Sequence, residues 1–365
     1  MYSIVFLMVF AFVTALVVTP LVRDSFLRLG LVDAADGRRK LHVGAIPRVG
    51  GVAIAVTYLA TFGVWLLTPL QGGELLEKEM DLVWRVLPAA GMVFLLGLVD
   101  DLRGLKAWTK LGVQVGAALI VFWAGVRLTG VGGGDLGVWW VSLPLTVFWL
   151  VLCTNAFNLI DGVDGLASGV GLFATVTALM AGLLMGNVGL VMATAALAGA
   201  LLGFLRYNFS PASIFLGDSG SYLVGFLLGC YGLLWSQKAA TVLGMTAPLM
   251  AMAIPLLDVG LSVARRVLRG APVFEGDRGH IHHMLLRRGW TVRRTVLVLY
   301  GVTGVFAVLS LIGSATQGRF AGVVVLLFAL VTWAGVQHLG YVEWSMAGRM
   351  LRQWGMRKVV GARGD

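Results

Sequence analysis

The chain has 365 residues, of which 58% are hydrophobic and only 13% are charged, whereas about 25% of the residues of a soluble domain carry a charge. This composition excludes an ordinary soluble protein, and its apolar runs of roughly 20 residues are long enough to cross a bilayer as helices. The formal net charge of +10 would suggest nucleic acid for a soluble protein, but in a membrane protein basic residues gathered on one side of the bilayer explain it, and no nucleic-acid partner is expected.

The apolar runs predict an all-α, polytopic transmembrane helix bundle of about eleven spans. Residues 1–340 are expected to form one transmembrane domain, and 341–365 a basic cytoplasmic tail. The first run is interpreted as a retained helix, because it lacks the basic start and the small-residue cleavage site of a signal peptide. The expected spans are 3–22, 49–69, 82–99, 111–127, 138–157, 166–185, 188–205, 213–235, 243–264, 295–313 and 319–338.

The distribution of Lys and Arg predicts the orientation of the bundle, with the N-terminus outside and the C-terminus cytoplasmic. In this orientation the cytoplasmic segments hold 23 of the 28 basic residues, as the positive-inside rule requires, and the opposite orientation inverts the ratio. Arg265 and Arg266, at the start of segment 265–294, are interpreted as topology signals that contact lipid head groups. The segments expected on the cytoplasmic side are 23–48, 100–110, 158–165, 206–212, 265–294 and 339–365.

Five aspartates lie at the cytoplasmic ends of predicted spans that are far apart in the sequence. Ionisable residues are costly in a membrane protein unless they serve a cavity or a pathway. We therefore expect the helix ends to bring these five carboxylates to one level. They are Asp100, Asp101, Asp161, Asp164 and Asp218.

Basic side chains occupy the same predicted face. Lys110 begins the fourth span, and Arg48 precedes the second. A further group of histidines, His280, His282 and His283, lies in the loop after the ninth span. Carboxylates beside cations indicate a hard divalent cation and an anionic substrate, because Mg²⁺ prefers oxygen ligands that it shares with substrate phosphates, while Lys, Arg and His hold phosphate oxygens.

Two polar turns carry the densest signals. In the stretch from Asn155 to Gly165, asparagine supplies a carbonyl oxygen for a metal, and Asp and Gly allow a tight turn that brings backbone amides close to a ligand. The second turn, from Phe215 to Ser221, offers Asp218 as a metal ligand and an aromatic ring that could stack on a base.

With these motifs the chain resembles the polyprenyl-phosphate N-acetylhexosamine-1-phosphate transferases, glycosyltransferase family 4, most closely the bacterial WecA/TagO type. The resemblance covers nearly the whole chain. One family feature is missing, because glycine stands at position 104 where the family often has a further aspartate. The matching motifs are Pro47-Arg48-Val49-Gly50-Gly51, Asp100-Asp101, Asn155 through Gly165, Gly217-Asp218-Ser219-Gly220-Ser221 and Asp277-Arg278-Gly279-His280-Ile281-His282-His283.

The resemblance implies roles for the matching residues. Asn158 and Asp218 correspond to the ligands of Mg²⁺, for which Mn²⁺ is an alternative. The aspartate pair corresponds to residues required for catalysis, with Asp100 as the candidate that activates the acceptor phosphate. The implied catalytic residues are Asp100, Asp101, Lys110 and His282, and the implied substrate-binding residues are Asp161, Asp164, Phe215, His280, His283 and Arg48.

The implied reaction transfers a sugar-1-phosphate from a UDP-sugar to undecaprenyl phosphate, giving the polyprenyl-pyrophosphate-sugar and UMP. UDP-GlcNAc is the default donor, with UDP-GalNAc or a deoxyaminosugar as alternatives. The implied site is the cytoplasmic face of the bacterial inner membrane, where the reaction would initiate an envelope polysaccharide such as lipopolysaccharide or teichoic acid. A homodimer is left open.

Other functions remain open from the sequence. Within the enzyme class, the alternative is the phospho-MurNAc-pentapeptide transferase of peptidoglycan synthesis. Outside it, the alternatives are an ion-coupled transporter, which would carry its acids near the bilayer midplane, and an assembly subunit without metal dependence. A direct single displacement is the expected route, and a phospho-aspartate intermediate is its alternative.

Overall fold

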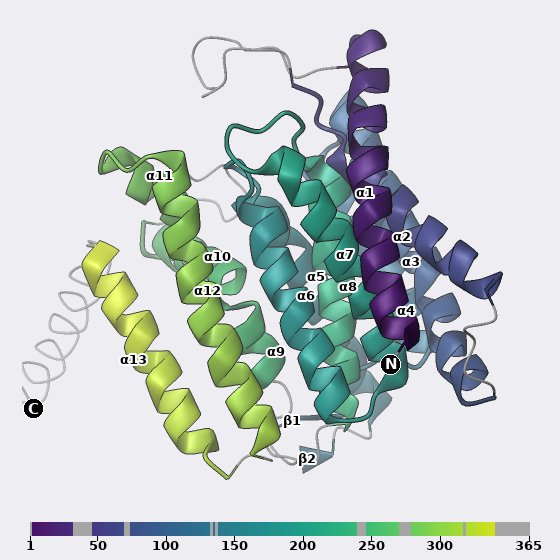
Figure 1. The fold of residues 1–365 in the computed structure, drawn as a ribbon. Coiled ribbons are helices and arrows are strands. Elements are labelled where there is room, and N and C mark those ends of the chain that lie inside the picture. The colour runs from purple at the N-terminus through teal and green to yellow at the C-terminus, as the bar shows by residue number, and fades with distance from the viewer. Residues whose placement is uncertain are drawn as a thin grey trace, which may run out of the picture.

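The computed structural model describes residues 2–31, 46–68, 74–131, 134–135, 138–238, 246–269, 279–316 and 319–339. In these parts the chain is a bundle of helices with one short antiparallel pair of strands (Figure 1). The elements are α1 (Tyr2–Arg28), α2 (Gly50–Leu66), α3 (Glu74–Arg103), α4 (Ala107–Trp123), β1 (Gly130–Val131), β2 (Gly134–Asp135), α5 (Trp139–Ile160), α6 (Leu166–Leu184), α7 (Val188–Asn208), α8 (Gly217–Lys238), α9 (Thr246–Ala251), α10 (Ala253–Arg269), α11 (Ile281–Arg287), α12 (Val292–Ala315) and α13 (Ala321–Leu339).

Each predicted span coincides with one helix, except for the ninth. The predicted span 243–264 contains two helices, α9 and α10, which are separated at Met252. Pro255 explains the break, because it has no N–H to donate to the carbonyl of Ala251, whereas proline is tolerated in the first turn of a new helix. The predicted tail, 341–365, lies outside the described residues.

Within the described residues, six helices are long and apolar enough to cross a membrane by length and composition: α1, the part of α3 from Val83, α5, α6, α7 and α12. Helices α2 and α4 and most of α13 are apolar but shorter. Large apolar side chains on the outer helices, such as Leu21, Leu326 and Trp333, are exposed, as expected of a surface that faces lipid. The chain is a polytopic membrane protein, while the count of eleven spans and the orientation stay predictions.

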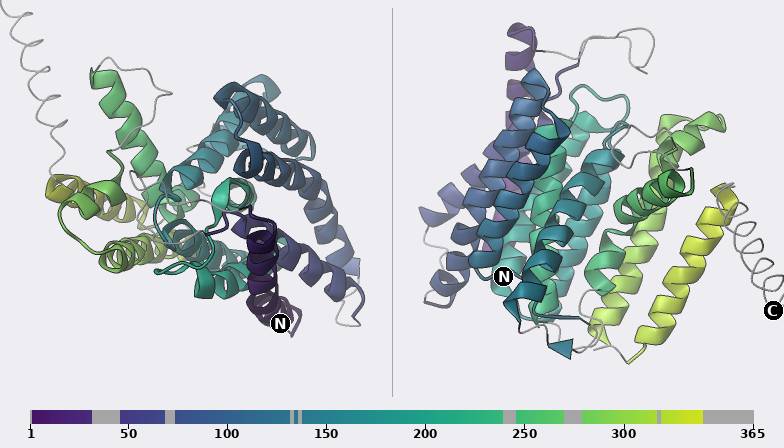
Figure 2. Two further views of the ribbon diagram at one scale, coloured as in Figure 1. Left: turned by 90° about the horizontal axis from the view of Figure 1, so that it is seen from above. Right: turned by 180° about the vertical axis from the view of Figure 1, so that it is seen from behind.

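Helix α7 forms the centre of the bundle. In the apolar 18-residue stretch of α7, 83% is buried, whereas in that of α1 only 22% is buried. Glycines let the two helices pack closely, because a Cβ atom on Gly199 would lie 2.2 Å from the carbonyl oxygen of Met8, and one on Gly203 would lie 2.6 Å from Cβ of Ala15. On the other side of α7, α6 leads to the outer helices α12 and α13 (Figures 1 and 2).

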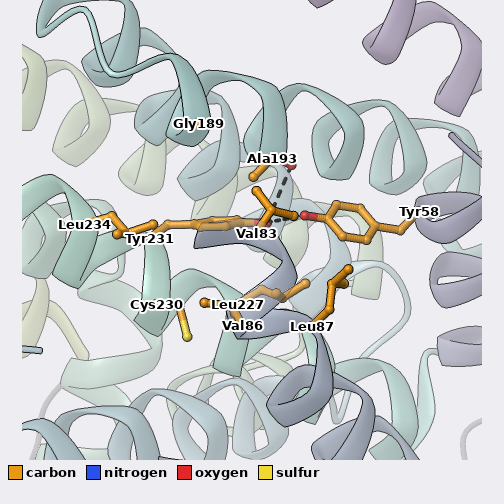
Figure 3. Close-up of a pocket in the computed structure, with 10 residues that line it drawn as sticks. All are labelled: Tyr58, Val83, Val86, Leu87, Gly189, Ala193, Leu227, Cys230, Tyr231 and Leu234. Carbon is orange, nitrogen blue, oxygen red and sulfur yellow. Dashed lines mark hydrogen bonds between the residues drawn. The ribbon is translucent and has the colours of Figure 1, made fainter. Parts of the chain in front are cut away.

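An apolar pocket lies between α2, α3, α7 and α8 (Figure 3). The hydroxyls of Tyr58 and Tyr231 are hydrogen-bonded across it at 2.9 Å, and the Tyr231 hydroxyl donates to the carbonyl of Ala193 at 3.4 Å. Tyr231 follows Asp218 on α8 by more than three turns, about 20 Å. The pocket is thus a packing feature of the core that is far from the acidic helix ends.

The polar turns gather at one end of the bundle. The connection between α7 and α8 and the helix α11 lie at the upper end in Figure 1, whereas β1 and β2 lie at the lower end. Hydrogen bonds link these turns, since Asp164, after α5, accepts from the backbone N–H of Ala212, after α7, at 3.0 Å.

Candidate active site

Asn158 and Asp218 meet where two helix ends converge. Asn158 lies in the last turn of α5, and Asp218 lies in the first turn of α8. The Asn158 amide donates to Oδ1 of Asp218 at 2.7 Å and to the Ser221 hydroxyl at 3.1 Å. The two residues that the sequence singled out as metal ligands are therefore in direct contact.

The chemistry of this pair fits a magnesium ion. Turning the amide of Asn158 over would present its oxygen beside the Asp218 carboxylate, and the two ends of an amide are assigned from hydrogen bonding alone. Among the described residues, no three His, Cys, Asp or Glu side chains form a ligand cluster. Mg²⁺ does not need such a cluster, because it is commonly held by one or two protein oxygens together with water and substrate phosphates.

Asp100, at the end of α3, forms an ion pair beside this site. Its Oδ2 accepts a hydrogen bond from Nζ of Lys110 at 2.8 Å, and its Oδ1 accepts from the backbone N–H of Leu105 at 2.7 Å. Asp100 is only 8% exposed, and its carboxylate interacts directly with that of Asp218. The hydroxyl of Tyr222 approaches the same oxygen as Lys110, at 3.5 Å.

Asp101 has different partners from its neighbour in sequence. Its two carboxylate oxygens accept from the backbone N–H groups of Asp218, at 2.8 Å, and of Ser219, at 2.9 Å. These donors belong to the first turn of α8, whose N–H groups have no partner within the helix. Asp101 therefore caps α8 and fixes the turn that carries Asp218.

The segment 46–51 packs against the start of α8 and is hydrogen-bonded to the residues just before it. The N–H of Phe215 donates to the carbonyl of Pro47 at 2.9 Å, and the N–H of Gly50 donates back to Phe215 at 2.9 Å. A Cβ atom on Gly51 would lie 2.2 Å from the backbone nitrogen of Gly220, so glycine is required for this approach. The ring of Phe215 is half-buried, whereas Arg48 is exposed at the edge of the site.

Asp161 lies near Asp218 and Asp101, whereas Asp164 is hydrogen-bonded to the connection between α7 and α8. Burial, together with the charges of Asp218 and Asp101, raises the pKa of Asp161 well above its ordinary range. The Asp164 carboxylate instead accepts the hydrogen bond from Ala212 described above, which ties the start of α6 to the α7–α8 connection. The sequence grouped all five acids, and the structure brings four of them around one point.

The rings of the three histidines lie close together at the start of α11, and one pair of them is stacked. The rings of His280 and His282 are parallel within 4° at 5.8 Å, and the rings of His282 and His283 lie 4.3 Å apart. A Cβ atom on Gly162, in the turn after α5, would lie 2.8 Å from Nε2 of His282. This contact joins the histidine group to the turn that carries Asp161.

His282 is buried and neutral. Burial and the neighbouring His283 lower the pKa of His282 from 6.5 to about 3. Its Nε2 atom has no hydrogen-bond partner among the described residues. A buried polar atom without a partner is costly, which is consistent with a group that a ligand satisfies.

Sequence reasoning missed the supports of this site. Tyr222 follows Asp218 by four residues on α8, a helical spacing that places both on one face, and this spacing was an available signal. Arg265 is only 3% exposed, so the expected contact of its side chain with lipid head groups was wrong. Its guanidinium packs where a Cβ atom on Gly279 would stand. Asp277 and Arg278 lie outside the described residues.

Comparison with known proteins decides the family. A family model described as glycosyl transferase family 4 matches residues 83–236, which include the whole acid cluster. A probable undecaprenyl-phosphate N-acetylglucosaminyl 1-phosphate transferase of Bacillus subtilis is 33% identical over 318 residues, which cover 86% of this chain and 85% of that protein. The chain belongs to glycosyl transferase family 4.

Two further relatives of this chain have names of the same kind. A decaprenyl-phosphate N-acetylglucosaminephosphotransferase of Mycobacterium tuberculosis is 36% identical over 306 residues, or 77% of this chain and 75% of that protein. The undecaprenyl-phosphate alpha-N-acetylglucosaminyl 1-phosphate transferase of Escherichia coli is 26% identical over 83% of this chain and 82% of that protein. The resemblance read from the motifs is thereby confirmed at the level of the family.

Proposed function

We propose that this transferase moves a sugar-1-phosphate, by default GlcNAc-1-phosphate, from a UDP-sugar to undecaprenyl phosphate and releases UMP. The observation that carries the proposal is the contact between Asn158 and Asp218 at 2.7 Å, next to the ion pair of Asp100 and Lys110 at 2.8 Å. Such a site offers oxygens for a metal and a cation for phosphate. The relatives named above act on polyprenyl phosphates and GlcNAc-phosphate by their printed names.

The proposed metal is Mg²⁺, held by Asn158 and Asp218, with Mn²⁺ as an alternative. When bound, it supplies charge neutralisation for the pyrophosphate of the donor and for the departing UMP. Asp101 is proposed to act through Asp218, because both of its oxygens are already bonded to the backbone of α8. It is a positioning residue in this scheme.

The chemical step is a single displacement in which an oxygen of the acceptor phosphate bonds to the β-phosphorus of the donor. The bond from that phosphorus to the bridging oxygen breaks, and UMP leaves. A phosphate monoester has a second pKa near 6, so the acceptor is largely ionised at neutral pH. Asp100 then accepts the residual proton or orients the acceptor, and Lys110, with the proposed help of His280, His282 and His283, stabilises the charge on the transferring group.

The donor and acceptor are expected to enter from different directions. The UDP-sugar is proposed to approach from the polar end of the bundle and to contact Asp161, Asp164, Phe215 and Arg48. The lipid acceptor reaches the site sideways from the bilayer. The polar end is proposed to face the cytoplasm of a bacterial inner membrane, where the product would begin an envelope polysaccharide.

The decisive experiment assays the purified protein in detergent with undecaprenyl phosphate, a panel of UDP-sugars and Mg²⁺, and measures UMP. We expect UMP release with UDP-GlcNAc that EDTA abolishes and added Mg²⁺ restores. The variant Asp218→Ala should be inactive. The matched control is Asp24→Asn, at a half-buried aspartate that bonds Arg23. UMP release only with UDP-MurNAc-pentapeptide would replace the proposed donor, and no UMP with any donor would refute the reaction.

A further inference from the structure

Asp258 is an acidic residue buried in an apolar helix, and the proposed reaction does not use it. It lies on α10, one and a half turns after its start, and is only 1% exposed. A buried carboxylate in a membrane protein is costly unless it is bonded to a partner. The partners of Asp258 therefore indicate what it does.

Both oxygens of Asp258 bond to the histidine segment. Its Oδ2 lies 2.8 Å from Nδ1 of His280, and its Oδ1 accepts from the backbone N–H of Ile281 at 2.7 Å. The first bond requires a proton on Nδ1, because an ionised carboxylate can only accept. The second bond holds the start of α11, so one side chain controls both the ring and its backbone.

The same face of α10 supports this segment at a second point. Arg265 follows Asp258 by two helical turns, and its guanidinium fills the space beside Gly279. Both side chains are buried, at 1% and 3% exposure. The segment that begins at Gly279 is thus docked on α10 rather than free at the surface.

From these contacts we propose that Asp258 is a positioning residue for transfer: it keeps a proton on Nδ1 and fixes the orientation of His280, so that Nε2, when it also carries a proton, donates to a phosphate oxygen of the donor. A carboxylate behind a histidine selects the tautomer of the ring and its direction, as in other sites built on histidine. The parallel stacking of His280 on His282 carries this orientation to the ring beside Gly162. The role of His280 in transfer rests on the proposed function, whereas the bond between Asp258 and His280 does not.

The first test measures the tautomer directly, without activity. The chain has five histidines, so nitrogen NMR of protein labelled only in histidine gives few ring signals, and His280→Gln identifies those of His280. We expect a proton on Nδ1 in the wild type and its loss from that position in a large fraction of Asp258→Ala molecules. A wild-type His280 protonated on Nε2 alone would overturn the proposal.

The second test is a double-mutant cycle on turnover with Asp258→Ala, His280→Ala and the double variant. If Asp258 acts through His280, each single change lowers kcat by about 10- to 100-fold, and the double variant is no worse than His280→Ala. Independent roles would multiply the two losses, and that result would overturn the proposal. Ser262→Ala, a buried polar residue one turn further along α10, is the control for disturbing the helix.

Two variants keep the tests decisive. If Asp258→Ala does not fold, Asp258→Asn replaces it, because its single carbonyl oxygen can serve only one of the two bonds. If His280→Ala keeps normal turnover while NMR finds the expected tautomer, the role of His280 in the proposed reaction fails, and the hold of Asp258 on the ring stands. If wild-type His280 carries no proton on Nδ1 and His280→Ala is inactive, His280 takes part in transfer but Asp258 does not set its tautomer. That result overturns the proposal.

Discussion

The backbone N–H of Asp218 donates a hydrogen bond at 2.8 Å to the carboxylate of Asp101, although the side chain of Asp218 contacts the neighbouring residue, Asp100. Two adjacent aspartates at the end of α3 thus serve one residue of α8 in different ways. Asp101 supports the backbone of the proposed metal ligand. Asp100 contacts the carboxylate of that ligand and forms an ion pair with Lys110.

This division predicts different phenotypes for the two aspartates. Asp100→Asn keeps the shape of the side chain and should lower turnover by at least about 100-fold, the scale of a lost base or electrostatic contact. Asp101→Asn places an amide against two N–H donors and should lower both turnover and the free energy of unfolding, the latter by about 1–3 kcal/mol. Steady-state kinetics and thermal unfolding in detergent measure both. A stability of Asp101→Asn equal to that of the wild type would contradict the capping role.

The contact between Asn158 and Asp218 predicts the dependence on metal concentration. Asn158→Leu removes one proposed ligand, and the Mg²⁺ concentration that gives half-maximal activity should rise by at least about tenfold. Activity titrated against Mg²⁺ at a saturating concentration of donor is the measurement. Asp24→Asn should leave the midpoint unchanged, and an unchanged midpoint in Asn158→Leu would remove this residue from the proposed metal site.

The contact between Gly162 and His282 predicts a steric effect on catalysis. Gly162→Ala would put Cβ at 2.8 Å from Nε2, closer than the ring can tolerate, so the ring must move. A displacement of that kind at a reacting site should lower kcat by about 10- to 100-fold. Gly63→Ala is the matched control, because its Cβ would meet nothing within 4 Å and alanine favours the helix. Similar kcat values for the two variants would argue against a role for the His282 ring.

The lowered pKa of His282 predicts how stability depends on pH. The folded site keeps the ring neutral down to about pH 3, whereas the ordinary pKa is 6.5. Below pH 6.5 the unfolded chain binds a proton that the folded site excludes, so the free energy of unfolding falls as the pH decreases. His280, His283 and Asp258 also face this ring, so the contribution of His282 is isolated by comparison with His282→Gln.

The measurement is the thermal unfolding midpoint at about pH 7.5 and about pH 5, a range in which histidine ordinarily gains its charge. The wild type should lose more stability than His282→Gln between these two conditions. An equal loss in both proteins would mean that the ring is protonated in the folded state.

The sequence alone determined that this protein is a helical membrane protein of its family, and it named the residues of the proposed site. Apolar runs predicted the helices because each must satisfy its own backbone hydrogen bonds in lipid. The family resemblance implied Asn158 and Asp218 as a metal-binding pair, and the fold brings these two side chains into contact. The cost of ionisable residues in a membrane protein grouped Asp161 with Asp218 from a distant part of the chain.

Only the tertiary structure decided how neighbouring residues divide their work. Asp100 and Asp101 look alike in sequence, but their side chains meet different helices, and the identity of a partner depends on packing between distant segments. For the same reason, the burial of Arg265 and the bond from Asp258 to His280 could not be read from the composition of α10. A sequence pattern records which side chains are polar, whereas the partner of each one is fixed only when the helices pack.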